Sequence, residues 1–138
     1  MRIRGFVMEW HFSAVDSNAA RAARRSFVDF LQSSCTAESD FESAEIVYGE
    51  LVANAIGHAA GPIDIHAQAD AHGLVRLDVC DTGKAFDLEA TLPPPESECG
   101  RGLYIVSKLC PTLSATGTAS GKTVSAVLPV RALALAPE

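Results

Sequence analysis

The sequence has little cysteine and no long hydrophobic run, and both shortages narrow the class of protein. Its four cysteines, Cys35, Cys80, Cys99 and Cys110, are widely separated and form no CxxC pair, so they indicate neither a zinc site nor a disulfide framework. The charges in the opening MRIRGFVMEW flank an apolar patch that is too short for a signal-peptide core or a membrane span. We therefore expect a cytoplasmic protein with no membrane partner.

Positive charge is also scarce. The formal net charge is −6 and the pI is about 5.1, whereas non-specific binding to nucleic acids requires a positive field. We therefore expect no direct nucleic-acid partner. With 138 residues, nearly half of them hydrophobic, the chain can bury one compact core without a metal or a disulfide. The sequence predicts an N-terminal tail over residues 1–8 and a single domain over residues 9–138.

Hydrophobic periodicity predicts strands and helices in alternation along this domain. The predicted helices follow a cap at Asp16 and a capping box formed by Ser39 and Glu42. The expected order is a strand at 9–14, a helix to about residue 32, a helix at 39–60, a hairpin of 63–69 and 74–80, a helix at 103–109, and strands at 112–116 and 123–129 around a Gly121-Lys122 turn. This order predicts an α+β fold, a two-layer sandwich with about three helices on one face of a mixed β-sheet.

A long segment without periodicity interrupts this pattern. Residues 82–99 contain a glycine, three consecutive prolines and several acids. Loops of this length inside compact domains are usually functional lids or disordered segments, so we interpret 82–99 as a lid.

Three short motifs whose residues could bind a ligand or take part in a reaction occur in order around the lid. Glu50 and Asn54 are four residues apart on a predicted helix, so both side chains lie at the rim of its apolar face. The DTG of residues 81–83 follows a strand, and the GRGL of residues 100–103 enters a helix after the lid. Each motif alone is weak evidence for a functional site, because a solvated pair, a turn and a flexible helix entry would account for the three motifs. Their occurrence in this order is more specific evidence.

The ordered set resembles the GHKL ATPases. ELVANA matches their N box, DTG matches their first glycine box, GRGLYIV matches their second glycine box, and GKT matches their weaker third box. The resemblance covers about Glu9 to Pro129 and implies the Bergerat fold, also called the histidine-kinase-like ATPase fold, with an ATP lid. The stand-alone domain, the ELVxNAxxHA form of the N box and GRGLYIVSKLC are most similar to the bacterial anti-sigma regulatory factors, which are serine kinases.

At the base end of the implied ATP site, Asp81 can accept a hydrogen bond from the exocyclic amine of adenine, whereas guanine would place a carbonyl there. This chemistry selects ATP over GTP, and the lost bond would cost about 1 to 3 kcal/mol. Gly83 lets the backbone approach the base closely. The resemblance further implies that Thr123 helps Asp81 to hold a water against the adenine.

At the phosphate end, Asn54 can offer a neutral oxygen to Mg²⁺, which is a hard cation that also binds phosphates. Glu50 can orient a water or accept a proton from an attacking hydroxyl, which would make it the catalytic residue. The backbone amides of Gly100, Arg101, Gly102 and Leu103 form a cradle for phosphate oxygens at a helix N-terminus, with charge from Arg101.

The resemblance implies a protein that sequesters a sigma factor and uses Mg-ATP to phosphorylate a serine on a small antagonist protein, and it implies a homodimer. Arg21, Arg24 and Arg25 form a basic patch on the first helix, and we expect Arg21 with Arg24 or Arg25 to contact an acidic partner. The alternative interpretation of the patch is a solvated helix face.

Two departures from the family pattern keep other functions open. Gly57 stands where many members have Lys or Arg, and Ala85 replaces the second glycine of the first box. Both changes favour a non-catalytic module in which ATP orders the lid and controls a partner. A detached histidine-kinase catalytic domain is a second alternative, although the sequence has no helical hairpin with a phosphoacceptor histidine. A plain α+β domain that binds no nucleotide is the third.

Overall fold

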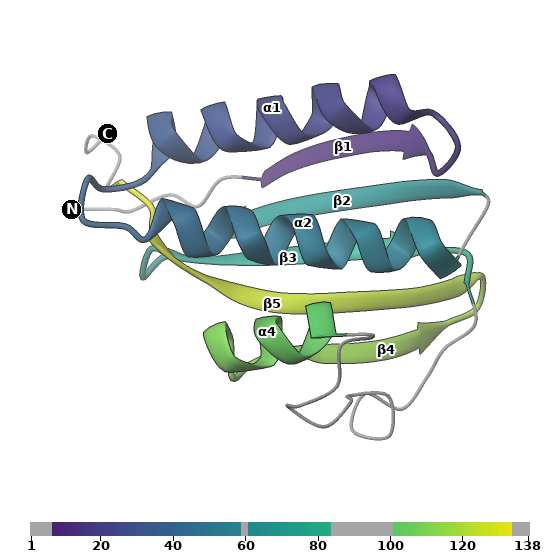
Figure 1. Ribbon diagram of the computed structural model, residues 1–138. Coiled ribbons are helices and arrows are strands. Elements are labelled where there is room, and N and C mark those ends of the chain that lie inside the picture. The colour runs from purple at the N-terminus through teal and green to yellow at the C-terminus, as the bar shows by residue number, and fades with distance from the viewer. Residues whose placement is uncertain (1–6, 59–60, 84–100, 134–138) are drawn as a thin grey trace.

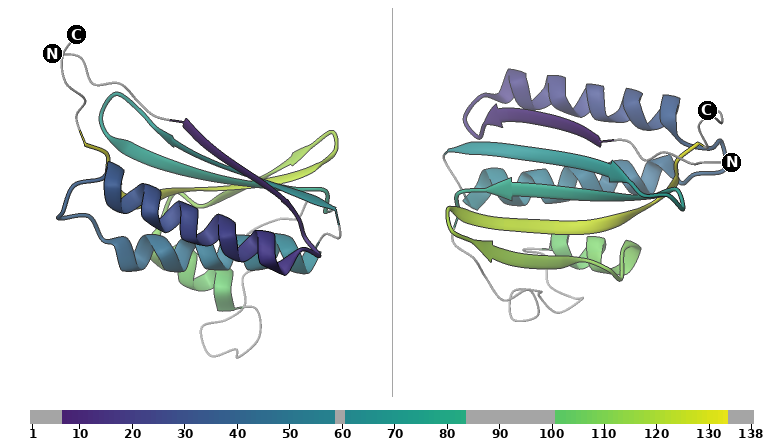
Figure 2. Two further views of the ribbon diagram at one scale, coloured as in Figure 1. Left: turned by 90° about the horizontal axis from the view of Figure 1, so that it is seen from above. Right: turned by 180° about the vertical axis from the view of Figure 1, so that it is seen from behind.

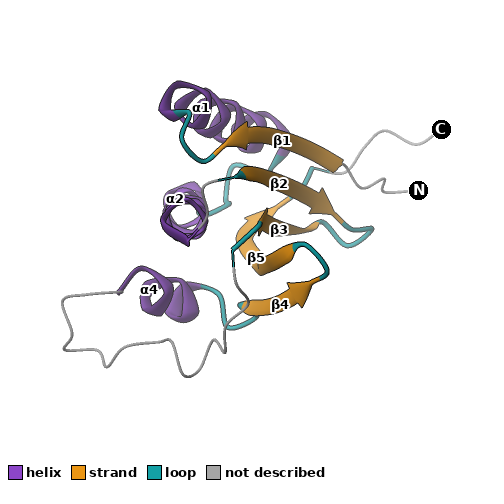
Figure 3. Cartoon of the chain, turned by 90° about the vertical axis from the view of Figure 1, so that its right-hand side faces the viewer, coloured by secondary structure: helices purple, strands orange, loops and turns teal. Residues whose placement is uncertain are grey.

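The computed structural model describes residues 7–58, 61–83 and 101–133, and the elements in these ranges form two layers (Figure 1). One layer is a five-stranded sheet in the order β1-β2-β3-β5-β4. The other is three helices on a single face of that sheet, as Figures 2 and 3 show from above and from the side. The elements are β1 (Val7–Ser13), α1 (Ser17–Ser34), α2 (Phe41–His58), β2 (Pro62–Ala69), β3 (Leu74–Asp81), α4 (Arg101–Leu109), β4 (Ser114–Thr118) and β5 (Gly121–Arg131). The predicted α+β sandwich is confirmed.

The expectation of a mixed sheet is wrong about strand direction, because every pairing among the described strands is antiparallel. The connection from β1 to β2 explains the difference. It contains two helices, α1 and α2, each of which traverses the length of the sheet (Figure 1). After two traverses the chain returns to the end at which β1 stopped, so β2 must run in the opposite direction to β1. A single crossover helix would instead have produced a parallel pair.

The first helix begins as predicted, and the cap of the second lies one residue later than predicted, so that α2 begins at Phe41. Asp16 caps α1 by accepting a hydrogen bond from the Ala19 amide at 3.0 Å. For α2 the cap is Asp40, not Ser39, because the Asp40 carboxylate accepts from the Ser43 amide at 3.0 Å. The hydrogen bonds from Ser43 hold the pKa of Asp40 below its usual value. The hydroxyl of Ser39 is used elsewhere.

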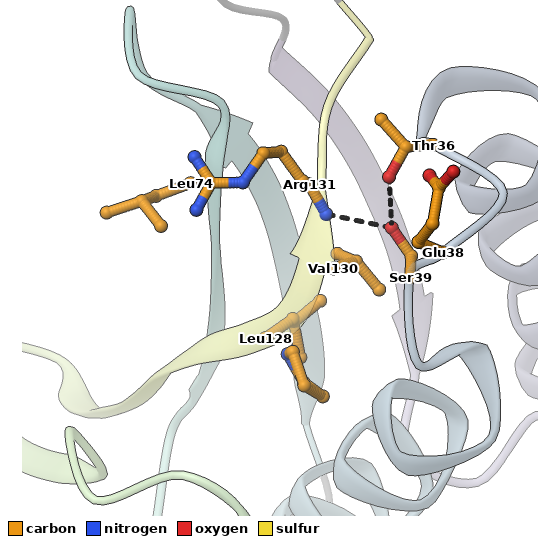
Figure 4. A pocket seen from close by; sticks show the side chains of 8 residues that line it. Thr36, Glu38, Ser39, Leu74, Leu128, Val130 and Arg131 are labelled. Carbon is orange, nitrogen blue, oxygen red and sulfur yellow. Dashed lines mark hydrogen bonds between the residues drawn. The ribbon is translucent and has the colours of Figure 1, made fainter.

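That hydroxyl anchors the connection between α1 and α2 to the end of β5. Ser39 Oγ accepts from the Arg131 backbone amide at 2.9 Å and lies 3.2 Å from Thr36 Oγ1 (Figure 4). These groups line a pocket together with Glu38, Leu74 and residues of β5. Arg131 also donates through its guanidinium to the His72 carbonyl at 2.8 Å. Since these polar groups satisfy one another and the pocket contains none of the predicted site residues, we interpret it as structural.

The core lies between the sheet and the helices. Alternate residues of each long strand point toward the helices, and the predicted apolar face of α2 is buried against them. The aromatic ring of Phe27 on α1 stacks on Tyr48 of α2 with centroids 4.2 Å apart, which joins the two helices. The buried residues of α2 are Ala44, Val47, Tyr48, Leu51, Val52 and Ala55.

Both hairpins are present, but the second has a different turn from the one predicted. Between β2 and β3, the Asp70 carboxylate accepts from the amides of His72 and Leu74, and Gly73 takes a φ of +83° that favours glycine. Between β4 and β5, Thr118 pairs with Gly121, so the turn consists of residues 119–120. The expected Gly121-Lys122 turn is therefore wrong, and Lys122 is a strand residue.

At the N-terminus, β1 begins at Val7, two residues before the expected strand, and residues 1–6 lie outside the described residues. Among the helices that the structure describes, none is long and apolar enough to cross a lipid bilayer.

The face of the sheet without helices carries a cluster of titratable groups that predicts a pH effect. His11 Nδ1 lies 2.5 Å from Asp64 Oδ1, and this hydrogen bond raises the pKa of His11 above its usual value. A raised folded-state pKa stabilises the fold fully below the unfolded pKa of about 6.5, and this contribution is lost as the pH rises through the folded-state value. Because both side chains are about half exposed, the effect should stay below about 1 kcal/mol.

We expect His11→Gln to be less stable than wild type at about pH 5.5 and equal to it at about pH 8.5. Urea unfolding of both proteins at the two pH values measures this difference. A deficit that is larger at the higher pH would contradict the assigned pairing.

Candidate active site

The four predicted motifs lie on elements that pack against one another. The second half of α2, the end of β3 and the start of β5 lie toward the right-hand side of Figure 1, and α4 lies beside α2. The helices α2 and α4 pack against each other, and α2 also packs on β3 and β5. Motifs that are up to about 70 residues apart in the chain are therefore brought to a common region by the antiparallel sheet and the helix pair above it.

Asn54 on α2 has an unusual environment. Its Oδ1 atom is buried and has no hydrogen-bond partner among the residues that the structure describes. A buried acceptor without a donor costs about 1 to 3 kcal/mol, so its presence calls for a ligand that would compensate it. A neutral amide oxygen is a suitable ligand for a hard cation, and the residue fits the predicted contact with Mg²⁺.

Glu50, one helical turn before Asn54, lies against the first turn of α4. A Cβ atom added to Gly102 would overlap Glu50 Oε2, so only glycine leaves room for the carboxylate in this position. Leu103 is 6% exposed and anchors the same turn in the core. The first amides of a helix have no intrahelical acceptor and carry the positive end of its dipole, which suits an anion. Gly100 and the side chain of Arg101 lie outside the described residues.

Asp81 closes β3 and forms a buried ion pair that the sequence did not suggest. Lys122 Nζ lies 2.9 Å from Asp81 Oδ1 and 2.7 Å from Oδ2, and the Gly83 amide donates to Oδ1 at 2.6 Å. The side chains of Asp81 and Lys122 are each 1% exposed. The two residues are directly paired across β3 and β5, so their side chains point to the same, helix-covered face.

Thr123 does not join this group. It pairs with Cys80, and since successive strand residues point to opposite faces, its side chain lies on the side of the sheet away from Asp81. There its Oγ1 atom is 3.2 Å from the Cys80 sulfur, and burial raises the pKa of that thiol. The expected contact of Thr123 with Asp81 is therefore replaced by that of Lys122. The alternation of buried residues along β5 is the signal that would have identified Lys122.

Glycine at position 121 holds the hairpin of β4 and β5 against the DTG motif. A Cβ atom at Gly121 would overlap the carbonyl oxygen of Asp81 and press on Thr82 Cα. Close backbone approach of this kind requires glycine. The GKT motif therefore has a structural role in fixing the position of Asp81. Residues 84–99 of the predicted lid, including Ala85, lie outside the described residues.

The basic patch on α1 is partly engaged within the protein. Arg24 pairs with Glu45 of α2 at 3.2 Å, and its guanidinium lies over Gly49. Arg21 donates to Asn18 at 2.8 Å, and Arg25 is exposed. Arg24 thus contributes to the contact between the two helices, and the proposed role of the patch in partner binding stays a prediction.

The α+β sandwich thus combines an amide oxygen that has no partner among the described residues, a carboxylate at a helix start and a buried aspartate at a strand end, which are groups that a nucleotide and its metal would need. A family model described as the histidine kinase-like ATPase domain matches residues 13–128. The chain therefore belongs to the histidine kinase-like ATPase domain family. No match was found among curated proteins.

The orphaned oxygen gives a prediction that separates a ligand-binding role of Asn54 from a structural one. We expect Asn54→Ala to raise the stability of the nucleotide-free protein by about 1 kcal/mol, because it removes an unpaired buried acceptor and favours the helix. The same variant should lose the stabilisation by Mg-ATP. Thermal unfolding with and without Mg-ATP measures both effects.

Tyr48→Phe is the matched control for this experiment. The Tyr48 hydroxyl is also buried without a partner among the described residues, and burial raises the pKa of Tyr48 to about 12. Tyr48 stacks on α1, so its replacement should stabilise the protein and leave the Mg-ATP effect intact. An Asn54→Ala protein that is destabilised without nucleotide would show that Asn54 has a structural partner.

Proposed function

We propose that this protein is an ATP-dependent serine/threonine kinase of a partner-switching system, which sequesters a sigma factor and phosphorylates a serine on its antagonist protein. Membership of the histidine kinase-like ATPase domain family supports the use of ATP. The observation that carries the proposal is Asn54 Oδ1, which is buried without a partner among the described residues, one helical turn from a carboxylate that lies at the start of α4. The sigma factor, the antagonist and a homodimeric assembly rest on the resemblance of the motifs.

Each described residue of the site would have its own role in the reaction. Asn54 Oδ1 would hold Mg²⁺, which would supply positive charge against the phosphates. The amides at the start of α4 would hold phosphate oxygens. The Glu50 carboxylate, beside that helix start, would accept the proton of the attacking serine hydroxyl. Asp81 would accept a hydrogen bond from the exocyclic amine of adenine.

One observation favours a second candidate, a non-catalytic module that binds ATP and thereby controls a partner. Gly57 has no side chain, so this position supplies no cation, and a side chain there would meet no described residue outside its own helix within 4 Å. Transfer of a phosphoryl group depends on charge stabilisation more than binding does. A site that holds ATP without transferring its phosphate would retain the features of Asn54 and Asp81.

Transfer of a radiolabelled γ-phosphate tests the proposal. The protein is incubated with labelled Mg-ATP and with small antagonist proteins encoded beside its gene, and the product is treated with acid, which phosphoserine survives and phosphohistidine does not. We expect acid-stable label on the antagonist. Glu50→Gln should lower the rate by about 10² to 10⁴ and leave the Kd for ATP unchanged, because it removes only the proton acceptor.

Glu45→Gln is the matched control, since Glu45 is an exposed carboxylate on the same helix that pairs with Arg24. It should leave transfer unchanged. ATP binding without any transfer would favour the non-catalytic module. Absence of a thermal shift at a hundredfold excess of ATP over a micromolar Kd, where about 2.7 kcal/mol is expected, would contradict both candidates.

A further inference from the structure

A groove between the two long helices contains none of the residues assigned to the nucleotide site. The helices α1 and α2 lie side by side over the sheet (Figure 1), and a space of about 210 Å³ remains between them. The space exists because α2 contributes Gly49 and Ala53 to the groove, which have little or no side chain. Its wall is otherwise mainly apolar, with contributions from Ala20, Val52 and Ile56.

The guanidinium groups of Arg21 and Arg24 also line the groove. Arg24 is paired with Glu45 at 3.2 Å, so these two charges offset each other. Arg21 donates to the neutral side chain of Asn18 at 2.8 Å and forms no ion pair with a residue that the structure describes. These groups therefore leave one net positive charge at the groove, although the protein as a whole carries −6. Because a guanidinium has five donors, Arg21 can bind an oxyanion without releasing Asn18.

The wall of the groove also contains a polar group that lacks a partner. Tyr48 lines the groove and is 1% exposed, and its hydroxyl forms no hydrogen bond with the described residues. Burial raises the pKa of Tyr48 to about 12, although the charge of Arg24 opposes this shift, so the hydroxyl keeps its proton at neutral pH. An unpaired buried donor is destabilising, and an oxygen acceptor brought into the groove would satisfy it.

The chemistry and the size of the groove define the class of ligand. The donors of Arg21 and Tyr48 suit the oxygens of a carboxylate, and the apolar wall suits a hydrocarbon body. Pockets for drug-sized ligands have volumes of about 300 to 1,000 Å³, so a space of 210 Å³ fits a smaller body, on the scale of a single ring.

We propose that the groove between α1 and α2 is a binding site for compact apolar monocarboxylates, the class to which phenylacetate belongs. The carboxylate would lie against Arg21, and the ring would lie on the apolar wall between the helices. This inference goes beyond the proposed function and does not depend on the binding of a nucleotide.

NMR titration of the ¹⁵N-labelled protein with phenylacetate tests the proposal. We expect saturable shifts of the backbone amides of Gly49 and Ala53, with a Kd of about 1 mM, as is usual for so small a ligand. Phenylacetamide is the matched ligand, because it has the same ring and no charge. It should bind at least about tenfold more weakly, since a charge-assisted hydrogen bond is lost.

Two pairs of variants assign the binding to the groove. Arg21→Gln should raise the Kd for phenylacetate by about tenfold, whereas Arg25→Gln, on the same helix and outside the groove, should leave it unchanged. Ala53→Leu should abolish binding by filling the groove, whereas Ala22→Leu makes the same change outside the groove and should have no effect. All four positions are exposed, so the variants should fold.

Four results would overturn the proposal. They are shifts that stay unsaturated up to about 20 mM phenylacetate, equal affinity for phenylacetamide, and a wild-type Kd in either Arg21→Gln or Ala53→Leu. Shifts in the groove that follow protein concentration without phenylacetate would likewise overturn it, in favour of a second copy of the chain as the occupant. Each of these results leaves the proposed function standing, because the titration contains no nucleotide and the variants change none of the residues assigned to the nucleotide site.

Discussion

Gly121→Ala is expected to lower the free energy of unfolding by about 3 kcal/mol and the melting temperature by about 10 °C. The reason is that a Cβ atom at this position would overlap the Asp81 carbonyl oxygen, which is a backbone atom and cannot swing aside as a side chain would. Relief requires β5 to move away from the end of β3. Because that movement also displaces Lys122 from Asp81, nucleotide binding should weaken together with stability. Thermal and urea unfolding measure the loss.

Gly57→Ala is the matched control for the same chemical change. Gly57 lies in α2, and the added atom would have no described residue outside its own helix within 4 Å. A glycine inside a helix costs up to about 1 kcal/mol relative to alanine. The control should therefore be slightly more stable than wild type. If Gly121→Ala unfolded at the wild-type temperature, the close contact between β5 and the DTG motif would not exist in solution.

The features that sequence patterns predicted are those fixed by neighbours in the chain. The cap at Asp16, the buried face of α2 and the turn at Asp70 all depend on contacts within a few residues, and each is present. The relative position of Glu50 and Asn54 follows in the same way from the helical repeat. Local periodicity was therefore sufficient to place half of the candidate site on a single helix.

The features that were missed depend on pairing between distant strands. Gly121-Lys122 contains a glycine and has the composition of a turn, whereas the actual turn is Ala119-Ser120, in which only serine favours a turn, and does so weakly. The resemblance, not the strand pattern, placed Thr123 in the site. Since successive strand residues point to opposite faces, the pairing of Lys122 with Asp81 places Lys122 beside Asp81 and turns Thr123 away from it. Lysine is rarely buried unless paired, and its partner Asp81 is 41 residues away, where no local pattern connects them.

The antiparallel sheet was missed for a related reason. Strand direction depends on how many helices lie between successive strands and on whether each traverses the sheet. The pattern of α1 and α2 revealed two helices but not their paths. The tertiary arrangement in Figure 1 supplies that information.

A second large effect is expected at the ion pair itself. Asp81→Asn should cost about 3 to 5 kcal/mol, because it removes the anion that lies against the buried Lys122 ammonium. Lys122→Met should cost a similar amount, because it removes the cation that lies against the buried carboxylate. The double variant Asp81→Asn with Lys122→Met should lose far less than the sum, since no uncompensated charge is left. Urea unfolding of the four proteins gives a coupling energy, which we expect to exceed about 2 kcal/mol.

The exposed pair of Arg24 and Glu45 provides the control cycle, because its side chains are 46% and 45% exposed. Its coupling should stay below about 1 kcal/mol, as is usual for solvated pairs. A similarly small coupling for Asp81 and Lys122 would mean that water reaches the pair. A large coupling has a consequence for function, because the domain is expected to be stable by only about 5 to 15 kcal/mol. Asp81→Asn would then weaken ATP binding partly by unfolding the protein, and the double variant would be the proper test of the contact between Asp81 and the base.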